Sequence, residues 1–225
     1  MKPSGLCRIC IIGLCLFAIE VGIAFQEAVK PGVTEWNLAA MNDSARANVT
    51  KSGDPVTVET SFGKAVLFDG TKDGIFVDEN PLRDLSEFTI EVLFRPDPGG
   101  LSEQRFFHMG EMSRDRVMLE TRLTPEDNWY LDAHIRSGDS ALTLIDSAKQ
   151  HPTGKWYHLA FVVRNGLMEA FVDRTLELRG GISFKPFKGG KTSLGVRQNR
   201  VYWFKGALAW IRITPACLEP AEFKK

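Results

Sequence analysis

Polar side chains capable of acid–base chemistry or charge pairing recur two residues apart in the middle of this chain. Glu120 and Arg122 form one such pair, Asp132 and His134 form a second, and His108 lies in a third stretch. Side chains two positions apart point to the same side of an extended strand. If the three stretches are neighbouring strands, their polar side chains form a row that can hydrogen-bond sugar hydroxyls and transfer protons.

Flat aromatic rings, on which the C–H faces of sugars stack, occur at Trp129-Tyr130 and Tyr202-Trp203. We therefore predict a ligand-binding face that consists of His108, Glu120, Arg122, Asp132, His134, Tyr202 and Trp203, with Arg105 in the same three stretches and Tyr202 and Arg197 at the border. An alternative stays open, because solvent-facing strand positions are commonly polar and Glu–Arg or Asp–His pairs are ordinary cross-strand neighbours. Trp129 alternates with apolar residues and fits a core position as well.

The same face offers groups for catalysis, which we keep as an alternative to binding alone. Glycoside hydrolysis requires two carboxyl groups about 5–5.5 Å or about 6.5–9.5 Å apart, and Glu120 with Asp132 is the best pair available. A polysaccharide lyase requires a base and a cation that neutralises a uronate, for which His134 or Tyr202 with Arg122 would serve. The candidate catalytic set is thus His134, Tyr202, Glu120 and Asp132, but no motif supports it and we expect binding without catalysis.

A metal site is predicted only weakly. Asp69 and Asp73 lie in a glycine-rich turn, and calcium prefers several carboxylate and carbonyl oxygens. In the competing interpretation, the Asp69 carboxylate accepts hydrogen bonds from its own backbone. This second interpretation is favoured, so no cofactor is expected, and calcium is the one candidate ion.

Short apolar runs with a period of two residues must position these groups. The runs at residues 88–95, 117–123, 129–136, 156–163 and 204–213 each fit a half-buried strand. Asn165-Gly166 predicts a tight hairpin, and strict alternation puts His108 on the side of Phe106. Because no long helical period accompanies the strands, we predict an all-β fold made of two antiparallel sheets packed as a sandwich.

The order of these motifs resembles the concanavalin A-like lectin/glucanase superfamily, in particular its laminin-G-like jelly-roll domains. The matching segments, within residues 33–223, are 36–38, 68–70, 88–91, 156–160, 165–173, 193–195 and 204–213. The resemblance implies a jelly roll that binds or processes glycans outside the cell.

The chain departs from the family pattern at two places. Ala209 and Trp210 occupy positions of the last strand that are often acidic in the family, and Arg174 replaces the glycine that follows Asp173. In the family, the aspartate of the last strand frequently binds a structural calcium ion together with the Phe-Asp-Gly turn. Its absence here weakens the calcium prediction.

Residues 1–24 have the pattern of a secretory signal peptide, in which Lys2 and Arg8 precede an apolar run and Ala24 supplies a small residue for cleavage. The run is shorter than the roughly 20 residues of a membrane span. We therefore predict one domain over residues 25–225, secreted, periplasmic or on the cell surface, without a transmembrane span. The 28 basic and 28 acidic residues form no basic stripe, so no nucleic-acid partner is expected.

Together these features predict an exported carbohydrate-binding or adhesion module that recognises a glycan on its concave sheet face. The first alternative is a lyase or glycoside hydrolase that degrades a polysaccharide on the same face. The second is a protein-interaction domain in which loops such as residues 101–104 and 114–115 make the contacts on a rigid support.

Overall fold

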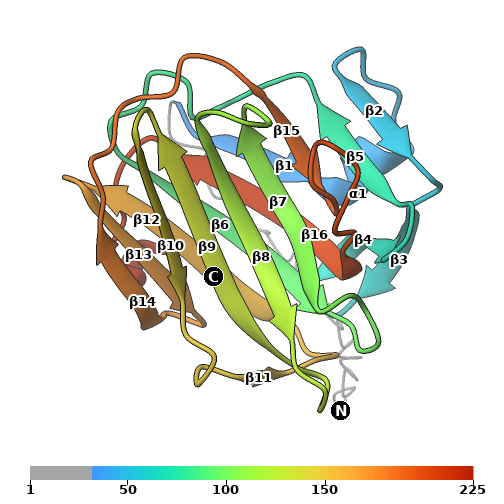
Figure 1. Ribbon diagram of the computed structural model, residues 1–225. Helices are drawn as coiled ribbons and strands as arrows, with labels where there is room; N and C mark the ends of the chain where they lie inside the picture. The colour runs from blue at the N-terminus through green and yellow to red at the C-terminus, as the bar shows by residue number, and fades with distance from the viewer. Residues whose placement is uncertain (1–31, 225) are drawn as a thin grey trace, which may run out of the picture. The chain divides into compact units, whose positions relative to one another are not determined.

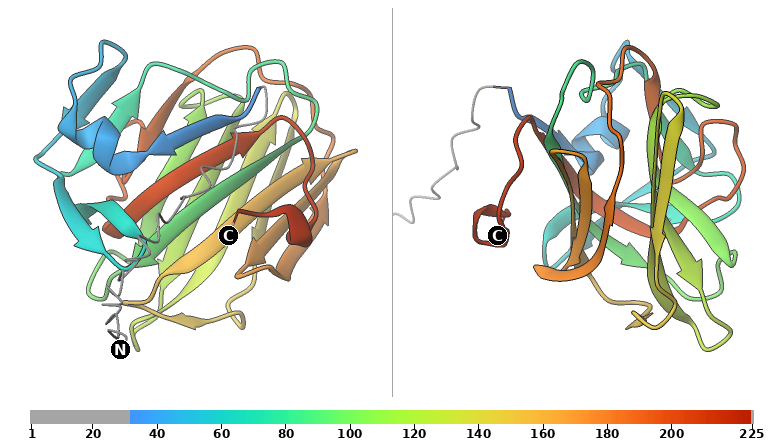
Figure 2. Two further views of the ribbon diagram at one scale, coloured as in Figure 1. Left: turned by 180° about the vertical axis from the view of Figure 1, so that it is seen from behind. Right: turned by 60° about the vertical axis from the view of Figure 1, so that its left-hand side comes forward.

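The computed structural model describes residues 32–224, and the predicted signal peptide, residues 1–24, lies outside the described residues. In the described part, two antiparallel sheets pack face to face, as the right-hand view of Figure 2 shows. The prediction of an all-β sandwich is confirmed. No helix within residues 32–224 is long and apolar enough to cross a bilayer.

The first sheet has the strand order β14-β13-β12-β6-β16-β4-β3, with β1 paired to β16. Its strands are β1 (Thr34–Asn37), β3 (Val56–Thr60), β4 (Gly63–Asp69), β6 (Phe88–Pro96), β12 (Tyr157–Arg164), β13 (Leu167–Val172), β14 (Thr175–Gly181) and β16 (Lys205–Thr214). The left-hand view of Figure 2 looks onto its outer side.

The second sheet has the order β10-β9-β8-β7-β15-β5-β2, with β11 paired to β9, and faces the viewer in Figure 1. Its strands are β2 (Val49–Ser52), β5 (Gly74–Val77), β7 (Glu103–Gly110), β8 (Arg116–Leu123), β9 (Asn128–Ser137), β10 (Ser140–Ile145), β11 (His151–Pro152) and β15 (Lys191–Leu194). Strands β7, β8 and β9, which carry most of the predicted ligand face, are direct neighbours.

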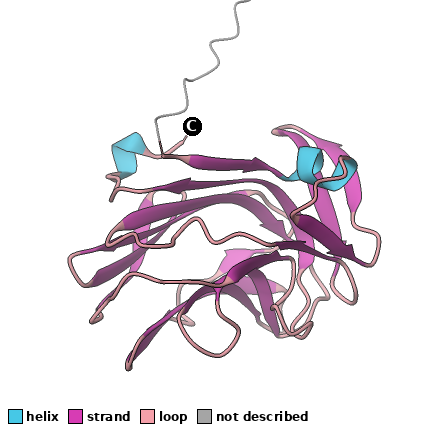
Figure 3. Ribbon diagram, turned by 90° about the horizontal axis from the view of Figure 1, so that it is seen from above, coloured by secondary structure: helices cyan, strands magenta, loops and turns pink. Residues whose placement is uncertain are grey.

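Two short helices, α1 (Leu38–Asp43) and η1 (Pro220–Glu222), both lie on the side of the first sheet (Figure 3). Residues 36–38, one of the segments that match the family, are not all in a strand: β1 ends at Asn37 and α1 begins at Leu38. The Asn37 side chain accepts a hydrogen bond from the Ala40 backbone N–H at 2.9 Å and thereby caps α1.

The core between the sheets consists of the alternate, inward-facing residues of the predicted strands. Trp129 on β9 is fully buried, with ring centroids 5.1 Å from both Phe94 and Tyr157. Burying an aromatic side chain of this kind stabilises a fold by about 1.5–3 kcal/mol. Trp129 is therefore a core residue and contributes nothing to a ligand face.

The predicted hairpin is confirmed, because β12 ends and β13 begins on either side of Asn165-Gly166, both with positive φ (44° and 76°). The prediction that the side chains of His108 and Phe106 lie on the same side of the sheet is wrong. A β-bulge between Arg105 and Phe107 inserts one extra residue into β7, so Phe106 packs into the core and His108 points outward.

Arg174, which replaces the family's glycine, has a specific role in this fold. It adopts φ +66°, a conformation that favours glycine. Its guanidinium donates hydrogen bonds to the backbone carbonyls of Pro220, Phe223 and Lys224. Arg174 thereby holds residues 218–224 against the outer side of the first sheet, where the Phe223 ring packs on Phe171 at 5.3 Å.

Replacing Arg174 by glycine is expected to release residues 218–224 from the sheet. The substitution removes three hydrogen bonds from a charged donor while relieving the backbone, so the net loss of stability should be about 1–2 kcal/mol. Limited proteolysis should cleave the variant near Phe223 much faster than the unmodified chain. Arg179→Gly on the adjacent strand is the control, and equal cleavage of both variants would contradict this role for Arg174.

Candidate functional site

The outer side of the second sheet carries five of the predicted ligand residues in three cross-strand rows. The rows are Arg105, Glu120 and Asp132; His108, Met118 and His134; and Glu103, Arg122 and Tyr130. Directly opposite residues of neighbouring strands share one face of a sheet, and the alternate residues Leu119 and Ala133 are buried in the core. We call this surface, with residues 196–203 beside it, the polar face.

Five charged residues, the ion network, occupy one end of the polar face; they are Glu103, Arg105, Glu120, Arg122 and Asp132. Arg105 Nε lies 2.9 Å from Glu120 Oε1, and Arg122 Nη2 lies 2.5 Å from Asp132 Oδ2. Glu103 contacts both arginines, at 2.9 Å from Arg105 and 2.5 Å from Arg122. Two guanidinium groups therefore hold three carboxylates, which leaves the network one negative charge in excess when all are ionised.

Of the three carboxyl groups, the one whose pKa is raised is that of Glu120, which is only 2 % exposed. Burial, with the charge of Asp132, raises the pKa of Glu120 to about 7, although Arg105 and Arg122 act to lower it. Asp132, also 2 % exposed, pairs with Arg122 through two nitrogens. Near neutral pH, Glu120 is thus a carboxyl group that can give or take a proton beside an ion-paired Asp132.

His108 has no exposed surface and lies beneath residues 196–200. Its Nδ1 accepts a hydrogen bond from the Gln198 backbone N–H at 3.3 Å, and its Nε2 lies 3.3 Å from the Glu111 carbonyl. Burial, together with Arg197 and Arg116, lowers the pKa of His108 to about 3. A neutral imidazole with both nitrogens partnered positions the neighbouring loop and is covered from any ligand.

His134 is more accessible. Its Nδ1 lies 2.9 Å from the Thr143 hydroxyl, while its Nε2 has no hydrogen-bond partner among the described residues. Burial lowers the pKa of His134 to about 4, with further lowering by Arg116, Arg136 and Arg197. His134 is therefore neutral at physiological pH and offers one free ring nitrogen to the polar face.

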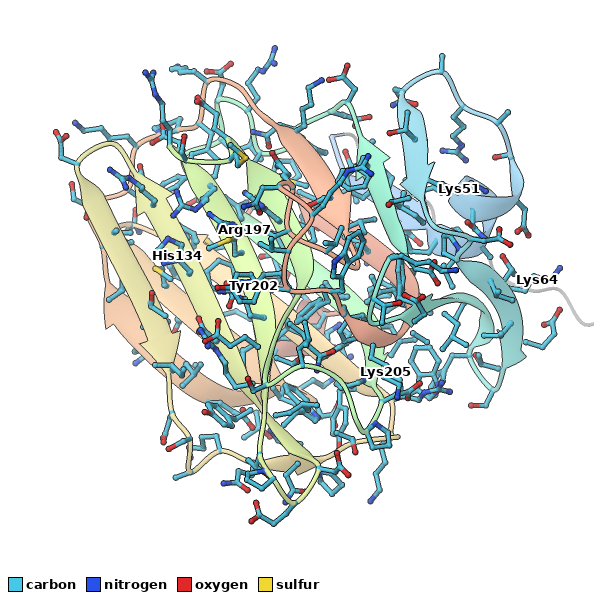
Figure 4. The ribbon with its side chains drawn as sticks, turned by 45° about the vertical axis from the view of Figure 1, so that its right-hand side comes forward. Lys51, Lys64, His134, Arg197, Tyr202 and Lys205 are labelled. Carbon is cyan, nitrogen blue, oxygen red and sulfur yellow. The ribbon has the colours of Figure 1, made fainter. Side chains whose placement is uncertain are left out.

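Tyr202 stands at the border of the polar face, where Figure 4 shows it near His134 and Arg197. The Arg105 backbone N–H donates to the Tyr202 carbonyl at 2.9 Å, and the Arg105 guanidinium carbon lies 3.6 Å from the ring centroid. Tyr202 is 38 % exposed. Arg105 thus fixes one side of the ring and leaves the exposed part available for stacking.

Trp203 lies farther along the same side, over β5. A Cβ added to Gly74 would lie 3.5 Å from the Trp203 ring, in ordinary contact, but only 2.6 Å from Val196 Cγ1, so a larger residue at this position would displace the Val196 side chain. A hollow of about 340 Å³ lies over β5. Its lining residues are Ala47, Asn48, Thr50, Phe76, Val77, Asp78, Lys191, Thr192, Gln198 and Arg200. Sequence reasoning missed this hollow, although the outward alternation of Phe76 with Ile75 signals an exposed aromatic residue.

A second hollow, of about 360 Å³, lies on the outer side of the first sheet and was not predicted either. Its lining residues are Phe62, Leu93, Trp156, His158, Asp173, Arg174, Trp210 and Lys224. Cations already cover its two indole rings: the Arg95 guanidinium lies 5.6 Å from Trp156, and Lys224 Nζ lies 4.5 Å from Trp210. The Lys224 backbone N–H donates to the buried Glu91 carboxylate at 2.6 Å, so residues 218–224 close one side of this hollow.

The Asp69 turn does not fit a calcium ion. Asp69 Oδ1 accepts backbone N–H groups of Thr71, Lys72 and Asp73 at 2.8–3.1 Å, and Oδ2 accepts the Thr71 hydroxyl. These hydrogen bonds outweigh the opposing effect of burial and lower the pKa of Asp69 to about 2. Asp73 Oδ1 accepts the Asp54 N–H at 2.9 Å. N–H donors thus occupy the oxygens that calcium would require, and we assign no chemistry to a metal here.

Solved structures with the same architecture include domain 4 of AbnA, a GH43 extracellular arabinanase from Geobacillus stearothermophilus, in complex with arabinotriose. That domain is 20% identical, with a TM-score of 0.52, and the match covers 77% of this chain and 84% of that one. The binding domain of botulinum neurotoxin DC in complex with SialylT is 11% identical, with a TM-score of 0.57, over 77% of this chain and 44% of that one.

Trypanosoma rangeli sialidase in complex with the inhibitor DANA is 12% identical, with a TM-score of 0.56, over 80% of this chain and 30% of that one. The chain therefore spans less than half of the toxin domain and of the sialidase. These identities establish a common fold alone. A search of curated protein sequences found no match to this chain.

The sequence itself matches a family model over residues 69–224, which is well over half of the chain. That range contains the polar face and most of both sheets. It also contains most of the motifs on which the resemblance was based. The chain belongs to the concanavalin A-like lectin/glucanases superfamily.

Proposed function

We propose that this chain is a carbohydrate-binding module and that the polar face is its binding surface. One observation carries the proposal: an exposed aromatic ring, Tyr202, rests on Arg105 of the same sheet face that holds hydrogen-bonding atoms without a partner among residues 32–224. Two of these atoms are Asp132 Oδ1 and His134 Nε2. Unpartnered buried polar atoms cost free energy, which a ligand that hydrogen-bonds them returns.

Two similar structures lend support from outside the chain. The arabinanase domain is described with arabinotriose and the toxin binding domain with SialylT. On the polar face of this chain, Arg122, held in place by Asp132, and His134 would orient sugar hydroxyls, and Tyr202 would stack on a sugar ring. His108 would position residues 196–200 without touching the ligand, and Trp203 would extend the surface toward the hollow over β5.

Affinity per sugar should be low. Each hydrogen bond contributes only about 0.5–1.5 kcal/mol net, because the same groups bind water in the free protein. A polysaccharide that occupies several subsites would add these small contributions along the polar face.

The test is glycan-array binding by the unmodified chain, followed by titration of the best glycan against two aromatic variants. Tyr202→Ala should weaken binding about tenfold, since loss of a stacking ring costs about 1–1.5 kcal/mol. Phe62→Ala is the matched control, because Phe62 is 54 % exposed and lies on the outer side of the first sheet. A loss with Phe62→Ala and none with Tyr202→Ala would refute the assignment to the polar face.

Polysaccharide cleavage on the same face is the second candidate, and the pKa of Glu120 near 7 beside the carboxyl group of Asp132 favours it. This arrangement resembles an acid paired with a charged carboxylate. Against it, both carboxyl groups are held by arginines and almost fully buried. New reducing ends, or new unsaturated ends absorbing in the ultraviolet, that disappear in Glu120→Gln or His134→Ala would establish cleavage.

Export remains part of the proposal, supported by the signal-peptide pattern of residues 1–24. A mature N-terminus close to residue 25 in protein recovered outside the cytoplasm would support it. A protein partner becomes the better account if no glycan binds and pull-downs repeatedly recover a single protein.

A further inference from the structure

Three arginines gather at the end of the polar face opposite the ion network. Arg116 on β8 and Arg136 on β9 lie directly opposite each other in the register. Arg197, on the segment that follows β15, reaches the same end and donates to the Met112 carbonyl at 3.4 Å. Figure 4 shows Arg197 close to His134, which lies between the two ends. We call Arg116, Arg136 and Arg197 the arginine cluster.

No carboxylate of residues 32–224 forms an ion pair with the arginine cluster, although the charge of Glu120 acts on Arg116 from farther along β8. Among the described residues, none of its members forms an ion pair, whereas both arginines of the ion network form several. The nearby Asp115 carboxylate instead accepts the Gly138 backbone N–H at 2.7 Å. Like charges directly opposite each other across two strands destabilise a sheet, so the Arg116–Arg136 pair costs the free protein stability.

Two N–H groups of the cluster lack acceptors, and one ring nitrogen beside it lacks a partner. Arg116 Nε, Arg197 Nε and His134 Nε2 are buried atoms without a hydrogen-bond partner in the described part of the chain. Arg116 Nη1 does donate to the Arg114 carbonyl at 2.8 Å, which fixes the direction of the side chain. The remaining guanidinium donors are therefore oriented and unoccupied, as in a site that donates hydrogen bonds to acceptors on a ligand.

The neighbouring titratable groups respond to this positive charge. Burial is the largest cause that lowers the pKa of Arg116, and Arg197 and Arg136 lower it further. The same arginines contribute to the low pKa values of His108 and His134. Both histidines stay neutral near pH 7, so the positive charge at this end belongs to the three guanidinium groups.

We infer that the ligand of the polar face is an anionic glycan, whose carboxylate or sulfate groups bind the arginine cluster. The inference rests on the proposed function and adds the charge of the ligand to it. Guanidinium groups bind such oxyanions through paired, charge-assisted hydrogen bonds. An oxyanion placed between Arg116 and Arg136 would remove their repulsion and supply acceptors to the unpartnered N–H groups, while Tyr202 stacks on the adjoining sugar.

The experiment compares two pairs of polymers with matched backbones, each titrated against the unmodified chain. One pair is polygalacturonate and its methyl-esterified form, and the other is dextran sulfate and dextran. At least one anionic polymer should bind tenfold or more tightly than its neutral partner, and the pair that shows this identifies carboxylate or sulfate as the recognised group. Because exposed charges are screened by salt, this preference should shrink as sodium chloride is raised.

The Arg116→Gln/Arg136→Gln double variant should lose tenfold or more of the affinity for the preferred anionic polymer. Lys64→Gln/Arg179→Gln removes the same net charge from the first sheet and should keep the affinity. Unfolding of the first variant should occur at an unchanged or higher temperature, because a like-charge pair has been removed; this separates a loss of binding from a loss of folding.

Equal binding of anionic and neutral partners, or equal losses in the two double variants, would overturn the inference. If only neutral glycans bind the chain, the anionic ligand is refuted while the polar face stands as a glycan site. If no glycan of either kind binds, the proposed function fails and the inference fails with it.

Discussion

Replacing Arg122 by methionine is expected to lower the free energy of unfolding by about 3 kcal/mol at pH 7. Arg122 contacts Glu103, Glu120 and Asp132, and the last two are almost fully buried. Methionine fills much of the same volume but supplies no charge, so the carboxylates would remain buried without their main counter-ion. Leaving a buried charge unpaired is strongly destabilising. Denaturant unfolding at pH 7 measures the loss.

Two further measurements show whether unpaired charge is the cause. Without Arg122 the pKa of Glu120 rises above about 7, so the variant's carboxyl group takes up its proton between about pH 9 and pH 7, and the deficit should narrow as the pH falls over that range. The Arg122→Met/Asp132→Asn variant should recover part of the loss. Arg179→Met is the control, because Arg179 pairs with Glu169 from an exposed position and should cost less than about 1 kcal/mol. A deficit that does not change with pH would point to lost packing instead.

Acidification from pH 7 to pH 4 is expected to remove about 3 kcal/mol of stability through His108 alone. Its folded-state pKa is about 3 and its ordinary value is 6.5. The unfolded chain therefore binds a proton below pH 6.5 that the folded chain refuses until about pH 3. Each unit of this difference is worth 1.36 kcal/mol. Stability is thus fully present above pH 6.5 and falls as the pH falls toward 3.

The check is a comparison of unfolding free energies at pH 7, 5.5 and 4 for the unmodified chain and His108→Asn. Asparagine keeps an acceptor for the Gln198 N–H but cannot be protonated, so the variant should lose stability less steeply on acidification. Glu120 acts in the opposite sense, because its raised pKa lowers stability as the pH rises from 4.5 to about 7. Glu120 is present in both proteins, so its contribution to the pH dependence of the unfolding free energy cancels when the two are compared. If the unfolding free energies of the two proteins fall equally with pH, the claim that His108 is a buried, neutral imidazole is contradicted.

Sequence reasoning predicted the sheet architecture because strand alternation and turn chemistry are local properties. The Asn165-Gly166 hairpin required only that both residues adopt positive φ, and alternation grouped Glu120 with Arg122 and Asp132 with His134, while the register of β8 and β9 makes these one face. His108 was misjudged relative to Phe106 because a β-bulge depends on pairing with the neighbouring strand. No residue pattern within β7 alone reveals the extra residue.

The candidate site was predicted only where it depends on alternation. Arg116 and Arg136 are each an even number of residues from Glu120 and Asp132, so the same rule places them on the polar face. Arg116 was missed because it precedes the predicted strand run, and Arg136 because no partner on the neighbouring strand was recognised. The stacking of Tyr202 on Arg105 depends on the path of residues 196–203, which tertiary contacts determine. Arg174 shows the same limit, since its partners lie 46 to 50 residues away along the chain.

An NMR titration with the best-binding glycan from the array tests the central claim most directly, because it reports which side of the sandwich the ligand touches. The account predicts that the ring signals of Tyr202 and His134 shift, together with the guanidinium signals of Arg122. The indole signals of Trp156 and Trp210, which line the hollow on the first sheet, should stay in place. Shifts centred on Trp156 and Trp210, with Tyr202 and His134 unmoved, would contradict the account and place the binding surface on the opposite side.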